Sequence, residues 1–266
     1  MPFNVSNTQP YVQYFSTHMH TPISPHPTMT TLQPFKILVF SKTTGYRHNS
    51  IPAGITLFHT LSNRTNSFTV ITTEDASLFT PTTLAAYTVI VLLQNIGPAI
   101  LTADQLSAFR DWVRAGGGVV AIHGAAAGMP EEKWYTDLIG ASFDMHPEPE
   151  AASIVPEVEA QKHYVMSGCG GRDGWMDEWY NFHTHPRENK NLDVLLRGDP
   201  KTFKGGKHGE DHPLVWCQEF QGGRVFYTAL GHFDEAYEDA WFVGQVERGL
   251  MWAARRERVI RGCFLV

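Results

Sequence analysis

Short apolar runs alternate with amphipathic helical segments from Phe35 onward, and this alternation most constrains how the chain can fold. Four runs have the apolar, β-branched character and the length of buried strands: residues 36–41, 67–72, 87–93 and 119–122. Between the first two runs, apolar side chains recur at helical spacing at Ile51, Ile55, Phe58 and Leu61. This order of elements predicts a mostly parallel, doubly wound sheet that is covered by helices on both faces.

The helix before the fourth run carries its own start and stop signals. Thr102 is a predicted N-cap, and Gln105 three residues later completes a capping-box pattern. Glycines at residues 116–118 are expected to end this helix. The local signals at both ends therefore agree with the alternating pattern.

The pattern changes after about Ala151. Short runs at residues 154–158, 163–166, 178–182 and 194–197 predict strands with little helix between them. Residues 215–220 and 224–230 read as a hairpin around Gln221, Gly222 and Gly223, and residues 242–252 as a closing helix. We therefore expect the second half to add antiparallel strands to the sheet.

The first 34 residues differ from the rest in composition. They contain no Lys, Arg, Asp or Glu, and six prolines are spread among Ser, Thr and His. We expect a disordered or loosely attached tail over residues 1–34 and a single α/β domain over residues 35–266.

Charge and residue counts argue against several classes of protein. Lys and Arg number 21 against 27 Asp and Glu, a net charge of −6, which disfavours a nucleic-acid partner. No apolar run approaches the ~20 residues that span a membrane. The three cysteines are too few and too widely spaced for a disulfide framework, and they suit the cytoplasm.

No phosphate-binding glycine motif follows the first strand, so no nucleotide cofactor is expected. Whether the chain forms a homo-oligomer is left open.

Ligands of an open parallel sheet bind at the carboxyl ends of its strands, which directs attention to the segments that follow each strand. Arg47 and His48 follow the first strand, and Asn95 follows the third. We predict that all three side chains bind substrate. The alternative is an ordinary loop in which Asn49 or Ser50 caps the following helix.

His123 follows the fourth strand at a predicted abrupt turn into a helix, where Gly124 and two alanines leave room for a tight elbow. Other α/β enzymes present a nucleophile at this place. An imidazole suits general acid/base catalysis or metal binding better than acyl transfer. The alternative is a structural histidine.

Two further segments carry candidate catalytic side chains. Glu178 is a predicted proton-transfer or hydroxyl-binding carboxylate, and Trp179 and Tyr180 are predicted to stack on a sugar ring. The alternative is a strand with aromatic core contacts and a solvated Asp177. His232 ends the last apolar strand at a Gly-His step and is a second candidate for catalysis.

Histidines from distant segments could also hold a metal ion. His48, His123, His212 and His232, together with Glu178, offer nitrogen and oxygen ligands for zinc or a similar divalent ion. Their spacing is not local, so this metal site is a hypothesis about how the fold brings them together.

The stretches KILVFSKTTGYRHNSIPAGI, VVAIHGAAAG, MDEWYNF and DHPLVWCQEFQGGRVFYTALGHFDEAYED resemble the trehalose utilisation (ThuA-like) family over about residues 35–254. The resemblance implies a class I glutamine-amidotransferase-like fold, a flavodoxin-like three-layer α/β sandwich. True amidotransferases of this fold have a cysteine at the elbow and a downstream His-x-Glu. This chain has His123 at the elbow and no such motif near its end, so the resemblance implies the fold without glutaminase chemistry.

The same resemblance implies a role in carbohydrate metabolism. We expect an enzyme that acts on a small sugar or keto-sugar related to trehalose, by isomerisation, elimination or hydrolysis. The alternative is a non-catalytic sugar-binding or regulatory protein on an amidotransferase-like fold, which the missing cysteine favours.

Overall fold

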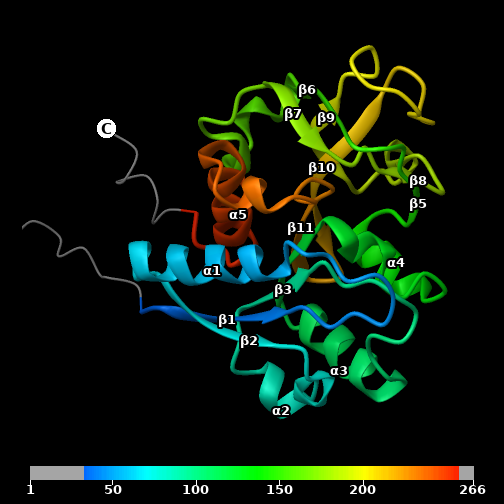
Figure 1. The fold of residues 1–266 in the computed structure, drawn as a ribbon. Coiled ribbons are helices and arrows are strands. Elements are labelled where there is room, and N and C mark those ends of the chain that lie inside the picture. The colour runs from blue at the N-terminus through cyan, green and yellow to red at the C-terminus, as the bar shows by residue number, and fades with distance from the viewer. Residues whose placement is uncertain (1–32, 258–266) are drawn as a thin grey trace, which may run out of the picture. The chain divides into compact units, whose positions relative to one another are not determined.

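A nine-stranded sheet lies at the centre of the structure, in the order β2-β1-β3-β4-β11-β10-β9-β6-β7 (Figure 1). The structure is a computed structural model that describes residues 33–257. The predicted tail over residues 1–34 lies outside the described residues except for Gln33 and Pro34, and so does Cys263.

The first half of the sheet is parallel, as predicted. It contains β1 (Phe35–Phe40), β2 (Phe68–Thr73), β3 (Val89–Leu93), β4 (Gly118–Ile122) and β11 (Gly223–Thr228). Parallel pairs join β1 to both β2 and β3, β3 to β4, and β4 to β11. Every residue of β3 and β4 is buried, because helices cover both faces there, and this burial explains their continuous apolar sequences.

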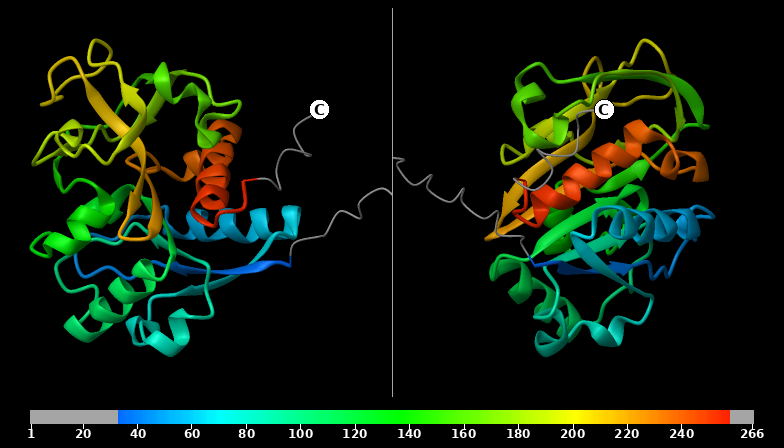
Figure 2. Two further views of the ribbon diagram at one scale, coloured as in Figure 1. Left: turned by 180° about the vertical axis from the view of Figure 1, so that it is seen from behind. Right: turned by 90° about the vertical axis from the view of Figure 1, so that its left-hand side faces the viewer.

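Helices cover the two faces of this parallel half. Figure 2 shows α1 (Ile51–Thr65) and α5 (Ala240–Ala253) on one face, with α2 (Pro81–Leu84) and α3 (Ala103–Arg114) on the other. The three-layer α/β sandwich is therefore confirmed. The predicted capping box is also present, because Thr102 and Gln105 hydrogen-bond each other's backbone at the start of α3. Helix α4 (Lys133–Ile139) follows the elbow after β4.

Antiparallel strands extend the sheet in the second half. They are β10 (His212–Phe220), β9 (Asp193–Gly198), β6 (Glu150–Pro156) and β7 (Arg172–Asp177). The predicted hairpin joins β10 to β11, with Phe220 opposite Gly223 and positive φ angles of 49° and 103° at Gln221 and Gly222. A separate two-stranded sheet pairs β5 (Phe143–Met145) with β8 (Asn181–Phe182).

Two of the predicted strands are wrong. Residues 163–166 contain a 3-10 helix, Tyr164–Met166, because the side chain of His163 accepts a hydrogen bond from the backbone N–H of Val165 and so favours a turn. Residues 178–182 are not one strand either, since β7 ends at Asp177 and β8 begins at Asn181. Glu178, Trp179 and Tyr180 are all buried. Successive side chains of a strand point to opposite faces, so three buried neighbours would require a strand that is covered on both faces.

Within residues 33–257, none of the helices combines the length and the apolar character needed to cross a membrane.

Candidate functional site

His123 sits at the elbow between β4 and a 3-10 helix, His123–Ala127, as the sequence predicts. Its φ of 48° is in the left-handed region, which is strained for a residue with a side chain and is found often at functional sites. The turn also needs a glycine next, because a Cβ at Gly124 would lie 2.9 Å from the side chain of Ile96. The imidazole of His123 is fully buried at the carboxyl edge of the parallel strands.

The hydrogen bonds of His123 decide which ring nitrogen is free. Nδ1 lies 2.6 Å from the backbone oxygen of Ala229, and a carbonyl only accepts, so Nδ1 carries a proton. The neutral ring therefore presents a lone pair at Nε2. Nε2 lies 2.9 Å from the hydroxyl of Tyr180 and 3.1 Å from Oε2 of Glu178. A lone pair facing a carboxylate at this distance requires a proton or a metal cation between them.

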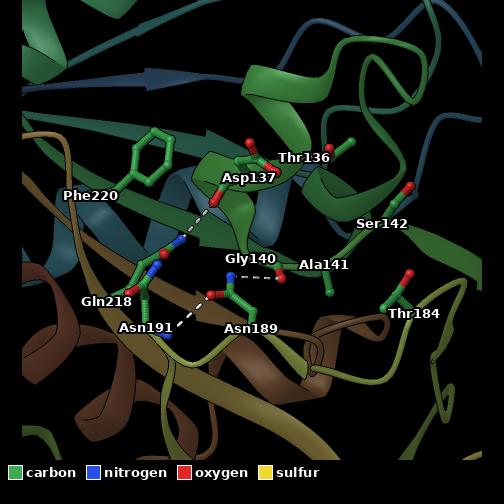
Figure 3. Close-up of a pocket in the computed structure, with 10 residues that line it drawn as sticks. All are labelled: Thr136, Asp137, Gly140, Ala141, Ser142, Thr184, Asn189, Asn191, Gln218 and Phe220. Carbon is green, nitrogen blue, oxygen red and sulfur yellow. Dashed lines mark hydrogen bonds between the residues drawn. The ribbon is translucent and has the colours of Figure 1, made fainter. Parts of the chain in front are cut away.

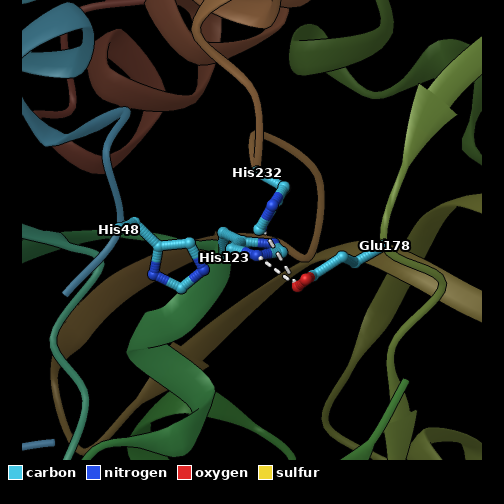
Figure 4. Close-up of side chains that lie close together, drawn as sticks. All are labelled: His48, His123, Glu178 and His232. Atoms are coloured by element: carbon cyan, nitrogen blue, oxygen red, sulfur yellow. Dashed lines mark hydrogen bonds and ion pairs between the residues drawn. The ribbon is translucent and has the colours of Figure 1, made fainter. Parts of the chain in front are cut away.

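Four side chains from distant segments converge around that nitrogen (Figure 4). His48, His123, Glu178 and His232 each offer one ligand atom, and these atoms all lie within 4.8 Å of one another. His48 follows β1, His232 follows β11 and Glu178 follows β7. The structure thus brings together three of the four histidines that the sequence offers as metal ligands, together with the predicted carboxylate.

Glu178 connects this cluster to a histidine that the sequence analysis did not single out. Its Oε2 lies 3.1 Å from Nε2 of His123 and 3.2 Å from Nδ1 of His232. Its Oε1 lies 3.2 Å from Nε2 of His146, whose side chain is about one-third exposed. Burial by itself would raise the pKa of Glu178, but hydrogen bonds and charge from His123 and His232 outweigh it and hold the pKa well below its usual range. Glu178 is therefore a carboxylate at neutral pH.

The pKa values of the two outer histidines of the cluster shift in opposite directions. Burial, followed by the nearby His123 and His232, lowers the pKa of His48 to about 3, so this ring is neutral. Its buried Nδ1 has no hydrogen-bond partner among the described residues. Burial would also lower the pKa of His232, but the hydrogen bond and the charge of Glu178 prevail and raise it. A neutral imidazole with an unpartnered nitrogen is the form that binds a metal.

The donor set fits zinc or a similar ion. Ligand atoms about 2.0 Å from a tetrahedral ion lie about 3.3 Å from one another. The separations of 3.1 Å and 3.2 Å between Glu178 and the two histidines agree with this spacing, and the other pairs of ligand atoms lie within 4.8 Å of one another. The bond from Nδ1 of His123 to a backbone carbonyl is the outer contact that orients metal-binding histidines in general.

Asp177 positions two members of the cluster. Its fully buried carboxylate accepts hydrogen bonds from the backbone N–H groups of Glu178, Gly231 and His232, and from Nε1 of Trp175. It thereby fixes the end of β7 against the loop that follows β11. The alternative of a solvated Asp177 is therefore wrong. Local sequence patterns do not reveal its burial, because two of its partners, Gly231 and His232, lie 54 and 55 residues away.

Gln94 holds the other side of the site together. It is not among the site residues predicted from the sequence. Its φ of 59° turns the chain at the end of β3. Its side-chain nitrogen lies 2.9 Å from both Oγ of Ser50 and the carbonyl oxygen of Gly231. Three loops are therefore bound to one another at the carboxyl edge of the sheet.

His212 does not join the cluster. It is buried beside Phe203 and His208, with ring centroids 4.9 Å and 5.3 Å away. As the first residue of β10 it pairs with Gly198 of β9, whereas the pairing with β11 begins only at Val215. The predicted set of metal ligands is corrected accordingly: His212 is removed, and His48, His123, Glu178 and His232 remain.

The predicted substrate-binding aromatics are also placed differently. Trp179 is fully buried and stacks on Phe203 at 4.7 Å, and Tyr180 is buried with its hydroxyl on His123. Neither ring has a face open to a sugar, because the chain turns inward after β7. Tyr180 therefore touches the cluster from within the protein.

Arg47 and Asn95 are engaged with the protein itself. The Arg47 guanidinium lies 2.6 Å from Glu74, and both side chains are about half exposed. The side-chain nitrogen of Asn95 donates to the backbone oxygen of Lys42, 2.9 Å away. Of the predicted substrate-binding residues, only His48 lies in the cluster.

Acidification from pH 7 to pH 5 is expected to destabilise the metal-free protein by about 2–4 kcal/mol. Burial lowers the pKa of His48 to about 3 and that of His212 to about 4, whereas both titrate near 6.5 when unfolded. The unfolded chain thus binds more protons below pH 6.5, and each histidine removes about 2 kcal/mol at pH 5. His232, with its raised pKa, favours the folded state below pH 6.5 and offsets part of this loss.

Urea denaturation at pH 7 and pH 5 with a chelator present measures this loss. His212→Leu should reduce the difference by about 2 kcal/mol, because its buried ring no longer titrates. His59→Leu, at an exposed position of α1, should not change it. Equal stability of the unmodified protein at both pH values would contradict the burial argument.

A cavity of about 380 Å³ between α4 and β10 is a competing location for a site (Figure 3). Hydroxyl and amide side chains line it, but no member of the cluster does. The side-chain nitrogen of Gln218 donates to the carbonyl oxygens of Asp137 and Leu138 near the end of α4. These contacts satisfy free carbonyls at a helix terminus, so they hold α4 in place.

Comparison with known proteins identifies the family. The model of the family described as "Trehalose utilisation" (ThuA) matches residues 36–253, and the chain therefore belongs to the ThuA family. No match was found among the curated proteins.

Solved structures show the same fold. A ThuA-like protein from Bacteroides uniformis has 24% identity and a TM-score of 0.70, with 86% of this chain and 95% of that chain covered. A ThuA-like protein from Parabacteroides merdae has 19% identity and a TM-score of 0.68, with 83% and 90% covered. A cytoplasmic protein from Salmonella typhimurium has 15% identity and a TM-score of 0.57, with 82% and 99% covered. At these identities the likeness supports the flavodoxin-like fold alone.

Proposed function

We propose that this ThuA-family protein is an enzyme of carbohydrate metabolism that acts on a trehalose-related sugar or keto-sugar through metal-assisted acid/base chemistry. The observation that carries the proposal is the convergence of three histidines and one carboxylate within 4.8 Å at the carboxyl edge of the sheet. The family description supports a sugar as the substrate class. The protein is expected to act in the cytoplasm, because few and widely spaced cysteines are typical of proteins in a reducing compartment.

His48, His123, His232 and Oε2 of Glu178 would hold a divalent ion such as zinc. When bound, such an ion acts as a Lewis acid that polarises a carbonyl or hydroxyl oxygen of the substrate. The protein's own contribution is to fix the ligands: the Ala229 carbonyl orients His123, and Asp177 holds the backbone of Glu178 and His232.

Glu178 is placed to move a proton. Its Oε1 faces His146, the most exposed histidine in contact with the cluster, so a proton taken by the carboxylate has a route toward solvent. A C–H group beside a ketone loses its proton to a basic side chain at this edge of the sheet, with Glu178 as the relay, and the bonding pair moves into the enolate. The enolate can then be reprotonated at the neighbouring carbon or can expel a leaving group, which corresponds to isomerisation or elimination.

Glutaminase chemistry is not supported by the elbow. His123 occupies the position where an acyl-transfer nucleophile would stand, and Cys169 and Cys217 are buried elsewhere. Burial raises the pKa of both thiols, which keeps them protonated and unreactive.

A keto derivative of trehalose incubated in D₂O tests the reaction. We expect the metal-loaded protein to exchange the proton on the carbon beside the ketone, which NMR detects as loss of that signal. The alternative function, a non-catalytic sugar-binding or regulatory protein, is favoured by the missing elbow nucleophile. A thermal shift with the keto-sugar but no exchange and no product would support that alternative and contradict the enzyme.

A further inference from the structure

A cavity of about 280 Å³ opens beside the cluster, between the loop after β1 and the loop after β11. It is lined by Tyr46, Asn49, Ser50, His232, Phe233, Asp234 and Glu235. His232 belongs to both the cavity wall and the cluster, so a molecule in this cavity lies next to the proposed metal ligands. The volume is slightly below the range of most ligand sites, which is roughly 300–1,000 Å³, and it suits a single ring.

The charge of the cavity wall excludes some ligands. Asp234 and Glu235 are exposed, and neither forms an ion pair within residues 33–257. No Lys or Arg lines the cavity, and the neighbouring Arg47 is paired with Glu74 on the surface. Two free carboxylates repel a phosphate or a carboxylate, but they accept hydrogen bonds from hydroxyl groups.

Two aromatic rings complete the wall, and each is braced by a cluster histidine. Tyr46 is 61% exposed, an unusual value for a large aromatic residue, and its ring meets His48 edge-on at 4.9 Å. The Phe233 ring meets His232 edge-on at 4.5 Å. An exposed aromatic face beside hydroxyl acceptors is the combination that holds a sugar ring, because the ring has apolar C–H faces and a polar rim.

We propose that this cavity is the substrate subsite for one ring of a neutral sugar and that it discriminates against phosphorylated sugars. Tyr46 supplies the stacking face in the place of the buried Trp179 and Tyr180, and Asp234 and Glu235 accept hydroxyl hydrogens. The proposal rests on the proposed function for its assumption that the ligand is a sugar. It adds that the sugar is uncharged, and it names the residues that select it.

Calorimetric titration of the full chain, with and without added zinc, tests the subsite. The probes are glucose and trehalose against glucose 6-phosphate and trehalose 6-phosphate at low ionic strength, where charge repulsion is least screened. We expect the neutral sugars to bind at least about tenfold more tightly than their phosphates. Tyr46→Ala should weaken binding of the neutral sugars about tenfold, whereas Tyr46→Phe, which keeps the stacking face, should stay within about twofold.

The paired substitution Asp234→Asn with Glu235→Gln is the test of discrimination. The double variant should bind neutral and phosphorylated sugars with more similar affinities than the unmodified protein does. Because both residues are exposed, the fold should persist. Phosphorylated sugars that bind as tightly as neutral ones, no binding of either neutral sugar, or an unchanged affinity in Tyr46→Ala would each overturn the subsite.

These outcomes are distinct from a failure of the proposed function. Turnover of a keto-sugar that is unaffected by Tyr46→Ala would leave the enzyme in place and remove the subsite. Sugar binding that depends on Tyr46, without metal or turnover, would keep the subsite and remove the enzyme.

Discussion

Replacement of His123 by asparagine is expected to lower keto-sugar turnover by about 10³-fold or more and to abolish metal binding. The substitution removes the Nε2 that lies 3.1 Å from Glu178 and 2.9 Å from Tyr180. Asparagine tolerates the left-handed backbone at this position, where φ is 48°, better than alanine does. Steady-state turnover and metal content of the purified variant measure the effect.

His59 provides the matched control. It is exposed on α1, so His59→Asn removes an imidazole without touching the site and should change neither turnover nor metal content. Circular dichroism confirms that each variant is folded before it is assayed. A folded His123→Asn variant with ordinary turnover would contradict the role of His123.

Replacement of Asp177 by alanine is expected to lower the free energy of unfolding by about 3–5 kcal/mol. The buried carboxylate accepts four hydrogen bonds, and without it the N–H groups of Glu178, Gly231 and His232 and the indole N–H of Trp175 lose their acceptor. Turnover should fall as well, because two cluster side chains lose the contact that positions them. Urea denaturation gives the change in stability.

Asp173→Ala on the same strand is the comparison for this variant. Asp173 is exposed on β7, and its replacement should change stability by less than about 0.5 kcal/mol. If Asp177→Ala were as stable as Asp173→Ala, Asp177 could not be holding the ends of β7 and β11 together.

The parallel half of the fold was predictable because its signals are local. β3 and β4 are buried at every residue, and such strands leave continuous apolar runs in the sequence. The candidate site was predictable in part for a geometric reason. The carboxyl ends of parallel strands meet at one edge, so the residues that follow them, His48, His123 and His232, gather there.

The remaining site residues depend on contacts that local patterns do not carry. Asp177 and Gln94 bind loops that lie more than forty residues away, and His146, which meets Glu178, directly follows β5 of the separate two-stranded sheet. Trp179 was expected to face a ligand but is buried, because three consecutive inward side chains replace the alternation of a strand. Tyr46, which has the exposed face, lies in a polar loop with no periodic signal.

Metal content tests the central claim most directly. Untagged protein is purified without chelator and is then incubated with zinc, manganese or nickel. Elemental mass spectrometry measures the metal that remains bound. The cluster of His48, His123, Glu178 and His232 predicts about one tightly held ion per chain, lost in His123→Asn and retained in His59→Asn and His212→Leu. Absence of a bound ion under every loading condition, or an ion that survives His123→Asn, would contradict the assignment of this cluster as a metal centre.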